Sequence, residues 1–291
     1  MVAYDAAHFD DHADYRRIDV RRLAGALGAE IHDVDLAQEL DDQIIGEIRH
    51  ALHTHCVVFF RDQDITPAQH LAFARHFGQV IEYPMVKGID GFPEIAPVAK
   101  MPGEIHNFGG MWHADTTYLE TPPLGAILVA RELPPYGGDT EFANMQLAYD
   151  TLSDGMKAML GRLHVVNTSS KAEVTKSRED RLTDAGTDEG KRNELVAVHP
   201  AVMPHPETGR KALFMNYGHT LKFQELSEAE SAPILEFLYR HQTRSEFTCR
   251  FQWRPGSIAF WDNWSCQHNP LNDYHGFKRV MHRITVARDA A

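Results

Sequence analysis

The sequence predicts a mainly β protein with flanking helices, in a barrel or jelly-roll arrangement. From residue 111 onward, short apolar or alternating segments follow one another, separated by Gly/Pro turns such as residues 134–138 and 254–256. Two helical patterns interrupt this series, and both are expected to pack outside the sheets. With 291 residues, 43% of them hydrophobic, the chain can bury the core of one large domain, and we expect residues 1–291 to form a single domain.

The N-terminal third mixes strands and helices. After a polar lead over residues 1–16, apolar residues at helical spacing predict a helix over residues 41–55. A second helix follows Thr66, an N-cap residue, has Pro67 at its first position and ends at Gly78. The strands expected in this third lie near Val20 and over residues 29–34 and 56–60.

The remaining chain is expected to be mostly strands. A helix is expected over about residues 147–160, and another begins at Ser227, whose S-x-x-E pattern with Glu230 is a capping box. Residues 171–193 are dense in charge and lack apolar periodicity, so they form either a solvated surface loop or a lid over an active site. The expected strands cover residues 111–118, 124–131, 140–144, 163–168, 195–198, 212–216, 247–253, 257–261 and 279–287.

Charge and composition exclude several classes of protein. The chain has 29 basic and 41 acidic residues, a net charge of -12, and no basic run dense enough to follow a phosphate backbone, which argues against a nucleic-acid partner. No apolar stretch approaches the ~20 residues that span a bilayer, and the start lacks an export signal. Cys56, Cys249 and Cys266 cannot all pair, so a reducing cytoplasm fits best. A homo-oligomer stays open.

A candidate metal site begins with the triplet His113-Ala114-Asp115. If residues 111–118 form a strand, its two-residue repeat places His113 and Asp115 on one face, where they can share a metal ion. The spacing alone is weak evidence, because His8-Phe9-Asp10 and His12-Ala13-Asp14 have it too. Those two triplets lie in the polar lead, whereas His113 lies in an aromatic, β-prone segment.

A third ligand has to come from a distant strand. Two histidines and one carboxylate on one face of an octahedron leave positions for a co-substrate and oxygen, which is typical of non-haem Fe(II) oxygenases. His268 is the candidate, because it follows an apolar strand and the segment Trp261-Asp262-Asn263-Trp264 and precedes a turn. Surface or core positions are the ordinary explanation for other histidines, such as His50, His70, His76 and His241.

Arg279 and Arg283 share one face of the last expected strand. An exposed polar face is the ordinary explanation of that spacing, and the pattern alone favours it. Two arginines facing a barrel interior would instead need buried anions, for which a 2-oxoglutarate carboxylate and an anionic substrate would serve. Their backbones are expected about 13 Å apart, since each strand residue rises ~3.3 Å, so two separate anions fit better than one.

Taken together, these segments closely resemble the taurine dioxygenase family, which includes the aryloxyalkanoate and alkylsulfate dioxygenases. The resemblance runs from about Val20 to Arg288 and lies in ordered motifs, which is far more specific than an isolated H-x-D triplet. The motifs are Trp112-His113-Ala114-Asp115, Glu120-Thr121-Pro122-Pro123, Gly125-Ala126-Ile127-Leu128, Gly137-Gly138-Asp139-Thr140, Gly209-Arg210-Lys211-Ala212-Leu213-Phe214, Trp261-Asp262-Asn263, Gln267-His268, Asp273-Tyr274 and Arg279-Val280-Met281-His282-Arg283.

The resemblance implies a double-stranded β-helix, or jelly roll, and an Fe(II)- and 2-oxoglutarate-dependent dioxygenase. Such an enzyme uses O2 to hydroxylate a small anionic organic substrate and releases succinate and CO2. The carboxylate of Asp115 argues for hydroxylation, because a halogenase of the wider superfamily has a non-ligating residue there. The implied roles are iron ligation by His113, Asp115 and His268, binding of the distal 2-oxoglutarate carboxylate by Thr140 and Arg283, lining of the iron pocket by Trp261, and binding of the substrate's acidic group by Arg279.

The chain departs from the taurine-specific pattern at substrate positions. Tyr83 stands where a taurine enzyme has histidine, His219 stands where it has an aromatic residue, and residues 108–111 lack its asparagine-rich run. The prime substrate is therefore open among sulfonates, sulfate esters and aryloxyalkanoate-like carboxylates. Two other functions use the same ligands: a non-catalytic metal-binding jelly roll that binds a small anion, and a zinc hydrolase. Oxygen-dependent conversion of 2-oxoglutarate to succinate separates the dioxygenase from both.

Overall fold

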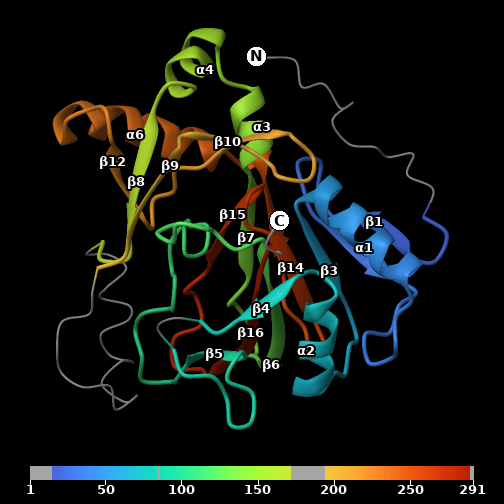
Figure 1. Ribbon diagram of the computed structural model, residues 1–291. Coiled ribbons are helices and arrows are strands. Elements are labelled where there is room, and N and C mark those ends of the chain that lie inside the picture. Colours follow the sequence, from blue (N-terminus) through green and yellow to red (C-terminus); the bar gives the residue numbers. More distant parts are fainter. Residues whose placement is uncertain (1–14, 84–85, 172–193, 289–291) are drawn as a thin grey trace.

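The computed structural model describes residues 15–83, 86–171 and 194–288 (Figure 1). Its largest element is an eight-stranded sheet in the order β1-β2-β3-β14-β6-β16-β4, in which β5 also pairs with β16. The pairs are antiparallel except that β2 runs parallel to β3. The strands are β1 (Asp19–Arg22), β2 (Ala29–His32), β3 (Val57–Phe60), β4 (Gln79–Ile81), β5 (Ala96–Lys100), β6 (Gly125–Glu132), β14 (Ile258–Asp262) and β16 (Arg279–Ala287).

A second, three-stranded sheet in the order β13-β7-β15 packs against the large one. Phe59 and Trp261 of the large sheet share one apolar core with Phe142 and Phe251 of the small sheet, and the rings of Phe59 and Phe251 stack at 4.0 Å. Two mainly antiparallel sheets that enclose one core form the jelly roll expected from the sequence. The strands of the small sheet are β7 (Thr140–Asn144), β13 (Thr248–Phe251) and β15 (Cys266–Pro270).

The other strands form a sheet in the order β12-β8-β9 and the hairpin β10-β11. Their bounds are β8 (His164–Thr168), β9 (Val196–Pro200), β10 (Val202–Pro204), β11 (Lys211–Leu213) and β12 (Thr220–Phe223). Helix α6 (Glu228–Gln242) packs on β12. Within the described residues, no helix has both the length and the apolar character needed to cross a membrane.

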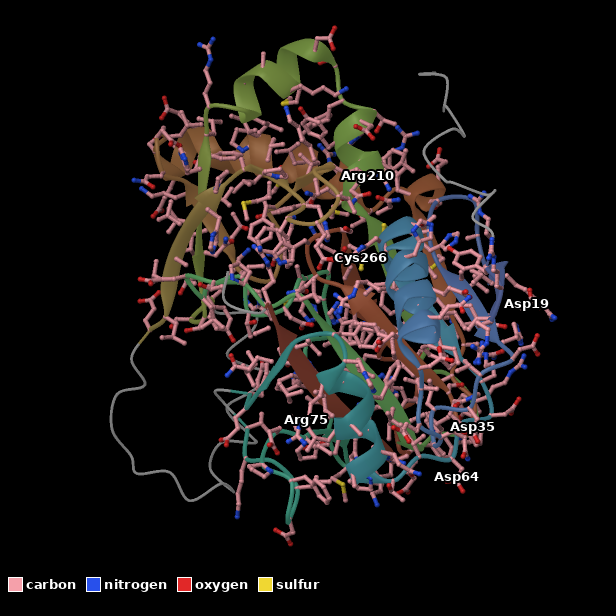
Figure 2. The ribbon with its side chains drawn as sticks, turned by 45° about the vertical axis from the view of Figure 1, so that its right-hand side comes forward. Asp19, Asp35, Asp64, Arg75, Arg210 and Cys266 are labelled. Carbon is pink, nitrogen blue, oxygen red and sulfur yellow. The ribbon has the colours of Figure 1, made fainter. Side chains whose placement is uncertain are left out.

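The helices cover the outside of the sheets, as Figures 1 and 2 show for α1 and α2 beside the large sheet. The predicted helix starts are confirmed: Thr66 and Gln69 form a capping box at α2, and Ser227 and Glu230 form one at α6. These caps satisfy backbone N–H groups that the first helical turn leaves without partners. The helices are α1 (Asp42–His55), α2 (Pro67–Arg75), α3 (Met145–Asp150), α4 (Asp154–Leu160), α6 (Glu228–Gln242) and the short 3-10 helix η2 (Ser245–Phe247).

Two predicted elements are wrong. The single helix expected over residues 147–160 is two helices, because Ser153 caps α4 by accepting a hydrogen bond from the N–H of Met156. The strand expected over residues 111–118 is a turn-rich segment in which His113 alone makes a bridge, to His268, and Thr116 adopts a positive φ of 48°. The suggested lid, apart from Lys171, and the first two H-x-D triplets lie outside the described residues.

Candidate metal centre and its cavities

His113, Asp115 and His268 converge in the interior of the jelly roll. All three are buried, and one ligand atom from each lies within 4.8 Å of the other two. The Oδ1 atom of Asp115 is 3.5 Å from Nε2 of His113 and 3.9 Å from Nε2 of His268. The sequence-based placement of the three residues at one site is therefore correct.

His113 and Asp115 are not brought together by the strand that the sequence pattern predicted. His113 is held against β15 by two backbone hydrogen bonds, because its N–H donates to the carbonyl of His268 and the N–H of His268 donates back, at 3.0 and 2.8 Å. Asp115 follows in a turn, not in a strand. Its backbone is held by Asn263, whose Oδ1 accepts from the Asp115 N–H at 2.8 Å and whose Nδ2 donates to the Asp115 carbonyl at 2.8 Å.

Two glycines allow the chain to pass close to His113, and the sequence reasoning missed both. Gly109 has a φ of +68°, and a Cβ atom there would lie 2.9 Å from Cε1 of His113. A Cβ atom at Gly218 would lie 2.9 Å from the Cβ of His113. Real side chains do not approach so closely, so a larger residue at either position would displace the imidazole. The glycine pair immediately before Met111 is the sequence signal that could have suggested the close approach at Gly109.

The donor set fits a transition metal. The Nδ1 atom of His113 lies 2.7 Å from the carbonyl oxygen of Met111. Since a carbonyl can only accept, Nδ1 carries the proton, and Nε2 presents its lone pair toward Asp115. Trp261 donates its indole N–H to Oδ2 of Asp115 at 3.0 Å, which orients the carboxylate. Two imidazoles and one oriented carboxylate are the ligands that non-haem Fe(II) enzymes use.

The charges at the site favour the metal-binding protonation states. Burial opposes the charge of Asp115, but Arg283, His268 and His113 outweigh it and hold the pKa of this carboxyl below its usual range. Burial, reinforced by His113, holds the pKa of His268 well below its ordinary value, so its imidazole is neutral near pH 7. Ionised aspartate and neutral imidazole are the forms that coordinate metal ions.

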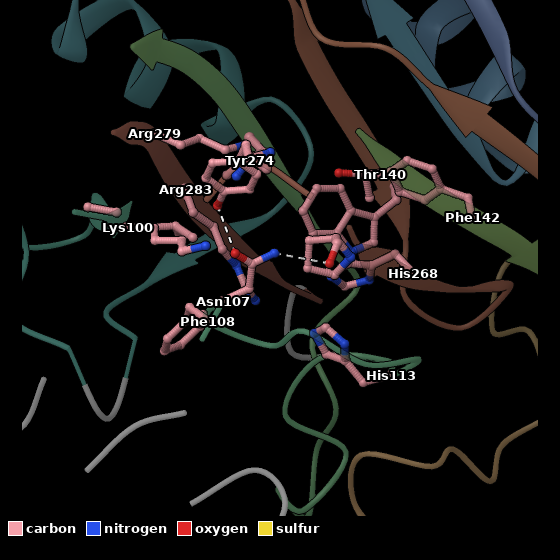
Figure 3. A pocket seen from close by; sticks show the side chains of 15 residues that line it. Lys100, Asn107, Phe108, His113, Thr140, Phe142, His268, Tyr274, Arg279 and Arg283 are labelled. Atoms are coloured by element: carbon pink, nitrogen blue, oxygen red, sulfur yellow. Dashed lines mark hydrogen bonds between the residues drawn. The ribbon is translucent and has the colours of Figure 1, made fainter. Parts of the chain in front are cut away.

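Two adjoining cavities reach the three residues, and both are lined by His113 and Phe108. The first, shown in Figure 3, contains the predicted co-substrate residues, and the second contains the predicted substrate residues Tyr83 and His219. The first is also lined by Thr140, Trp261, His268, Arg279 and Arg283, and the second by Asp115 and Thr116.

Both arginines of β16 face the interior, so the exposed polar face that the pattern favoured is wrong. Arg279 and Arg283 are each 5% exposed. Nη1 of Arg283 lies 3.0 Å from Oδ1 of Asp115, and its guanidinium carbon lies 5.0 Å from the centre of the Tyr83 ring. The guanidinium carbon of Arg279 lies 5.7 Å from the centre of the Trp253 ring. The indole N–H of Trp253 donates to Thr140 Oγ1 at 3.0 Å. Thr140 and Arg279 therefore both contact Trp253, whereas Arg283 contacts the predicted metal ligand Asp115.

A sequence model described as "Taurine catabolism dioxygenase TauD, TfdA family" matches residues 19–285. The chain belongs to this family. An alkylsulfatase of Acinetobacter baylyi is 34% identical to it over 280 residues, covering 94% of this chain and 86% of that protein. An alpha-ketoglutarate-dependent sulfate ester dioxygenase of Pseudomonas putida is 32% identical over 278 residues, covering 93% and 89%.

Solved structures agree with this membership in the TauD/TfdA family. The crystal structure of a putative alpha-ketoglutarate-dependent taurine dioxygenase from Burkholderia xenovorans superposes with a TM-score of 0.80 and 36% identity, covering 94% of this chain and 93% of that one. The enzyme class expected from the sequence is confirmed: this is a 2-oxoglutarate-dependent dioxygenase of a family that requires Fe(II), 2-oxoglutarate and O2.

Some cavity residues of this TauD/TfdA chain escaped the sequence reasoning. Asn107 links two parts of the wall, because it accepts a hydrogen bond from the Tyr274 hydroxyl at 2.8 Å and donates to the carbonyl of Leu271 at 2.9 Å. Lys100 lines the same cavity from β5. Neither position lies in one of the recognised motifs, although Tyr274 does, so only Tyr274 carried a signal.

Proposed function

We propose that this enzyme holds Fe(II) through His113, Asp115 and His268 and oxidises a small organic anion while 2-oxoglutarate is converted to succinate and CO2. The convergence of three buried ligand atoms within 4.8 Å carries the proposal. Bound iron would supply the chemistry that activates O2 together with 2-oxoglutarate, and the protein supplies binding, orientation and exclusion of water.

Relatives support an anionic prime substrate. They include dioxygenases named for sulfate esters, sulfonates and 2,4-dichlorophenoxyacetate, and compounds of these three classes are anions near pH 7. We infer the same class here, a sulfonate, a sulfate ester or an aryloxyalkanoate. We also assign the enzyme to the reducing cytoplasm, without a nucleic-acid or membrane partner, because its charge is -12 and its three cysteines are buried free thiols.

The packing supports an exchange of the roles that the resemblance implied for the two arginines. Arg279 and Thr140 meet at Trp253 in the first cavity, where the distal carboxylate of 2-oxoglutarate would bind through charge-assisted hydrogen bonds. Arg283 contacts Asp115 and Tyr83, which line the second cavity, so it is better placed for the acidic group of the prime substrate. His219 lies on that side too, with its ring centre 6.1 Å from that of His113.

Trp261 and Asn263 act on the reaction through Asp115. Trp261 orients the carboxylate of Asp115, and Asn263 forms hydrogen bonds with both the N–H and the carbonyl of Asp115. The metal ligand is thereby held in one orientation before any ligand binds, which reduces the ordering that catalysis would require. Trp261 is 1% exposed and its ring centre lies 4.7 Å from that of His268, so it also excludes water from the centre.

Succinate release tests the proposal. Protein, Fe(II), 2-oxoglutarate and O2 are mixed with a panel of organic sulfonates, sulfate esters and aryloxyalkanoates, and the compound that stimulates succinate release identifies the substrate class. His268→Ala should abolish stimulated release while circular dichroism stays native, whereas the exposed His76→Ala should retain it. Full activity in His268→Ala, or activity without O2, would contradict the assignment.

A further inference from the structure

Lys100 and Arg279 face one another across the large sheet. Lys100 is the last residue of β5 and Arg279 the first of β16, and they are direct partners in the antiparallel register. Side chains of direct partners lie on the same face, with Cβ atoms about 4.5–5.5 Å apart. Both are buried, at 2% and 5% exposure, and both line the first cavity. In Figure 3 they lie on the side of this cavity away from His113 and His268.

Two buried cations in this arrangement repel one another, because like charges directly opposite destabilise a sheet and the interior screens them poorly. Nζ of Lys100 donates to Oδ1 of Asn272 at 2.5 Å and lies 4.4 Å from the centre of the Tyr274 ring. These two contacts orient the ammonium group beside the cavity. Among the described residues that line the first cavity, none is an aspartate or glutamate.

Arg279 is incomplete in a way that points to a ligand. Its Nε and Nη2 atoms are buried and have no hydrogen-bond partner within residues 15–83, 86–171 and 194–288. Buried guanidinium N–H groups without acceptors are costly, so such a group is a built receptor for an oxyanion. Next to it, Thr140 Oγ1 accepts from the indole of Trp253, which leaves the hydroxyl proton of Thr140 available to a ligand.

We propose that Lys100 joins Arg279 in a two-cation site for the distal carboxylate of 2-oxoglutarate, and that Lys100 thereby determines the enzyme's selectivity for its co-substrate. This inference rests on the function proposed above. A carboxylate has two oxygens and about four acceptor sites, enough for two N–H groups of Arg279, the ammonium of Lys100 and the hydroxyl of Thr140. The prime substrate approaches from the second cavity, which Lys100 does not line.

A contact between Lys100 and the distal carboxylate should change the enzyme's selectivity between two keto acids. 2-Oxovalerate has the same five-carbon chain as 2-oxoglutarate but a methyl group in place of the distal carboxylate. Loss of the Lys100 charge should therefore weaken 2-oxoglutarate and leave 2-oxovalerate unchanged. A charge-assisted hydrogen bond is worth about ten- to hundredfold in affinity, which sets the expected loss.

Calorimetric titration of the Mn(II)-loaded full-length protein with both acids measures this selectivity without turnover. Lys100→Met should bind 2-oxoglutarate about ten- to hundredfold more weakly than wild type and 2-oxovalerate equally well. Lys100→Arg, which keeps the charge, should restore part of the difference. Lys278→Met is the matched control, because Lys278 precedes Arg279 but pairs with Glu132 at 2.7 Å outside the cavity.

Three other outcomes would contradict either the role of Lys100 or the proposed function. If wild type binds 2-oxoglutarate and Lys100→Met binds it equally well, Lys100 does not contact the co-substrate. If Lys100→Met weakens both acids alike, Lys100 supports the fold instead of the selectivity. If wild type binds no 2-oxoglutarate, the proposed function fails with it. Lys100→Gln replaces Lys100→Met should the latter not fold, and circular dichroism decides that point.

Discussion

The protein contains two buried charged clusters that are built in opposite ways. Behind the metal centre, His205 and Asp262 form an ion pair at 2.9 Å, with both side chains 0% exposed. Asp262 follows Trp261 in β14, and since side chains alternate along a strand, Trp261 faces the cavity and Asp262 faces the other way. On the cavity side, Lys100 and Arg279 bring two cations together.

The difference lies in whether the cluster is complete. Asp262 balances the charge of His205 and also accepts hydrogen bonds from the Ser265 hydroxyl at 2.6 Å and the Trp264 N–H at 2.9 Å. Arg279 has buried N–H groups without hydrogen-bond partners and, unlike His205, no carboxylate at ion-pair distance within the described residues. A complete cluster stabilises the fold, whereas an incomplete one is completed by a ligand. Mutations in the first cluster should therefore lower stability, and mutations in the second should lower affinity.

The largest expected effect follows from breaking the complete cluster. His205→Ala leaves the Asp262 charge buried without its counter-ion, which should lower the free energy of unfolding by about 3–5 kcal/mol. Denaturant unfolding monitored by circular dichroism measures it. The double variant His205→Leu, Asp262→Asn should recover part of this loss, because no buried charge then lacks a partner. A His205→Ala protein as stable as wild type would show that the pair is not a stabilising element.

Breaking the incomplete cluster should change binding by about one to two orders of magnitude, the value of a lost charge-assisted contact. Arg279→Gln should raise the KM for 2-oxoglutarate by that factor with little loss of stability. Arg283→Gln should chiefly weaken the prime substrate found in the panel and leave slow, substrate-independent 2-oxoglutarate decay intact. Steady-state kinetics of both variants separate the roles. A larger rise in the 2-oxoglutarate KM for Arg283→Gln would support the opposite assignment, in which Arg283 binds the co-substrate.

The sequence predicted those parts of the fold and of the site that depend on local patterns. The helix caps at Thr66 and Ser227 depend on residues three apart, so they could be read directly. The three metal-site residues were found by motif and resemblance. The geometry that joins them was not predicted, because His113 is positioned by its bridge to His268, which lies far away along the chain.

Long-range pairing explains the other failures as well. The spacing of Arg279 and Arg283 is the same for an exposed and a buried face, and only the packing of β16 against its neighbours decides between them. Lys100 lies in a short strand without clear alternation, so its position opposite Arg279 could not be inferred before the register was known. Residues whose role depends on a ligand look, in the sequence, like ordinary surface charges.

The smallest expected effect is the pH dependence of the complete cluster. Burial opposes the charge of His205, and so do the backbone N–H groups of Glu207 and Thr208, which donate to its Nδ1 atom. Asp262 and Glu207 outweigh both and raise the pKa of His205 above its ordinary value of 6.5. Burial likewise opposes the charge of Asp262, but His205 and the hydrogen bonds of Asp262 outweigh it and lower its pKa below 3.8. The His205 contribution to stability is therefore fully present below about pH 6.5 and is lost as pH rises through its folded pKa. The Asp262 contribution is present above about pH 4 and is lost as pH falls through its folded pKa.

The stability difference between wild type and His205→Gln should thus be largest between about pH 4 and 6.5 and should shrink as the pH is raised toward 9, by at most about 1.4 kcal/mol per pH unit. Urea unfolding of both proteins across this range measures the difference. Neighbouring His53 does not mimic the effect, because burial lowers its pKa. His53→Gln serves as the control and should show no comparable decline above pH 6.5. A wild-type advantage that stayed constant or grew toward pH 9 would mean that His205 is neutral in the folded protein, and the cluster would then be held by hydrogen bonding alone.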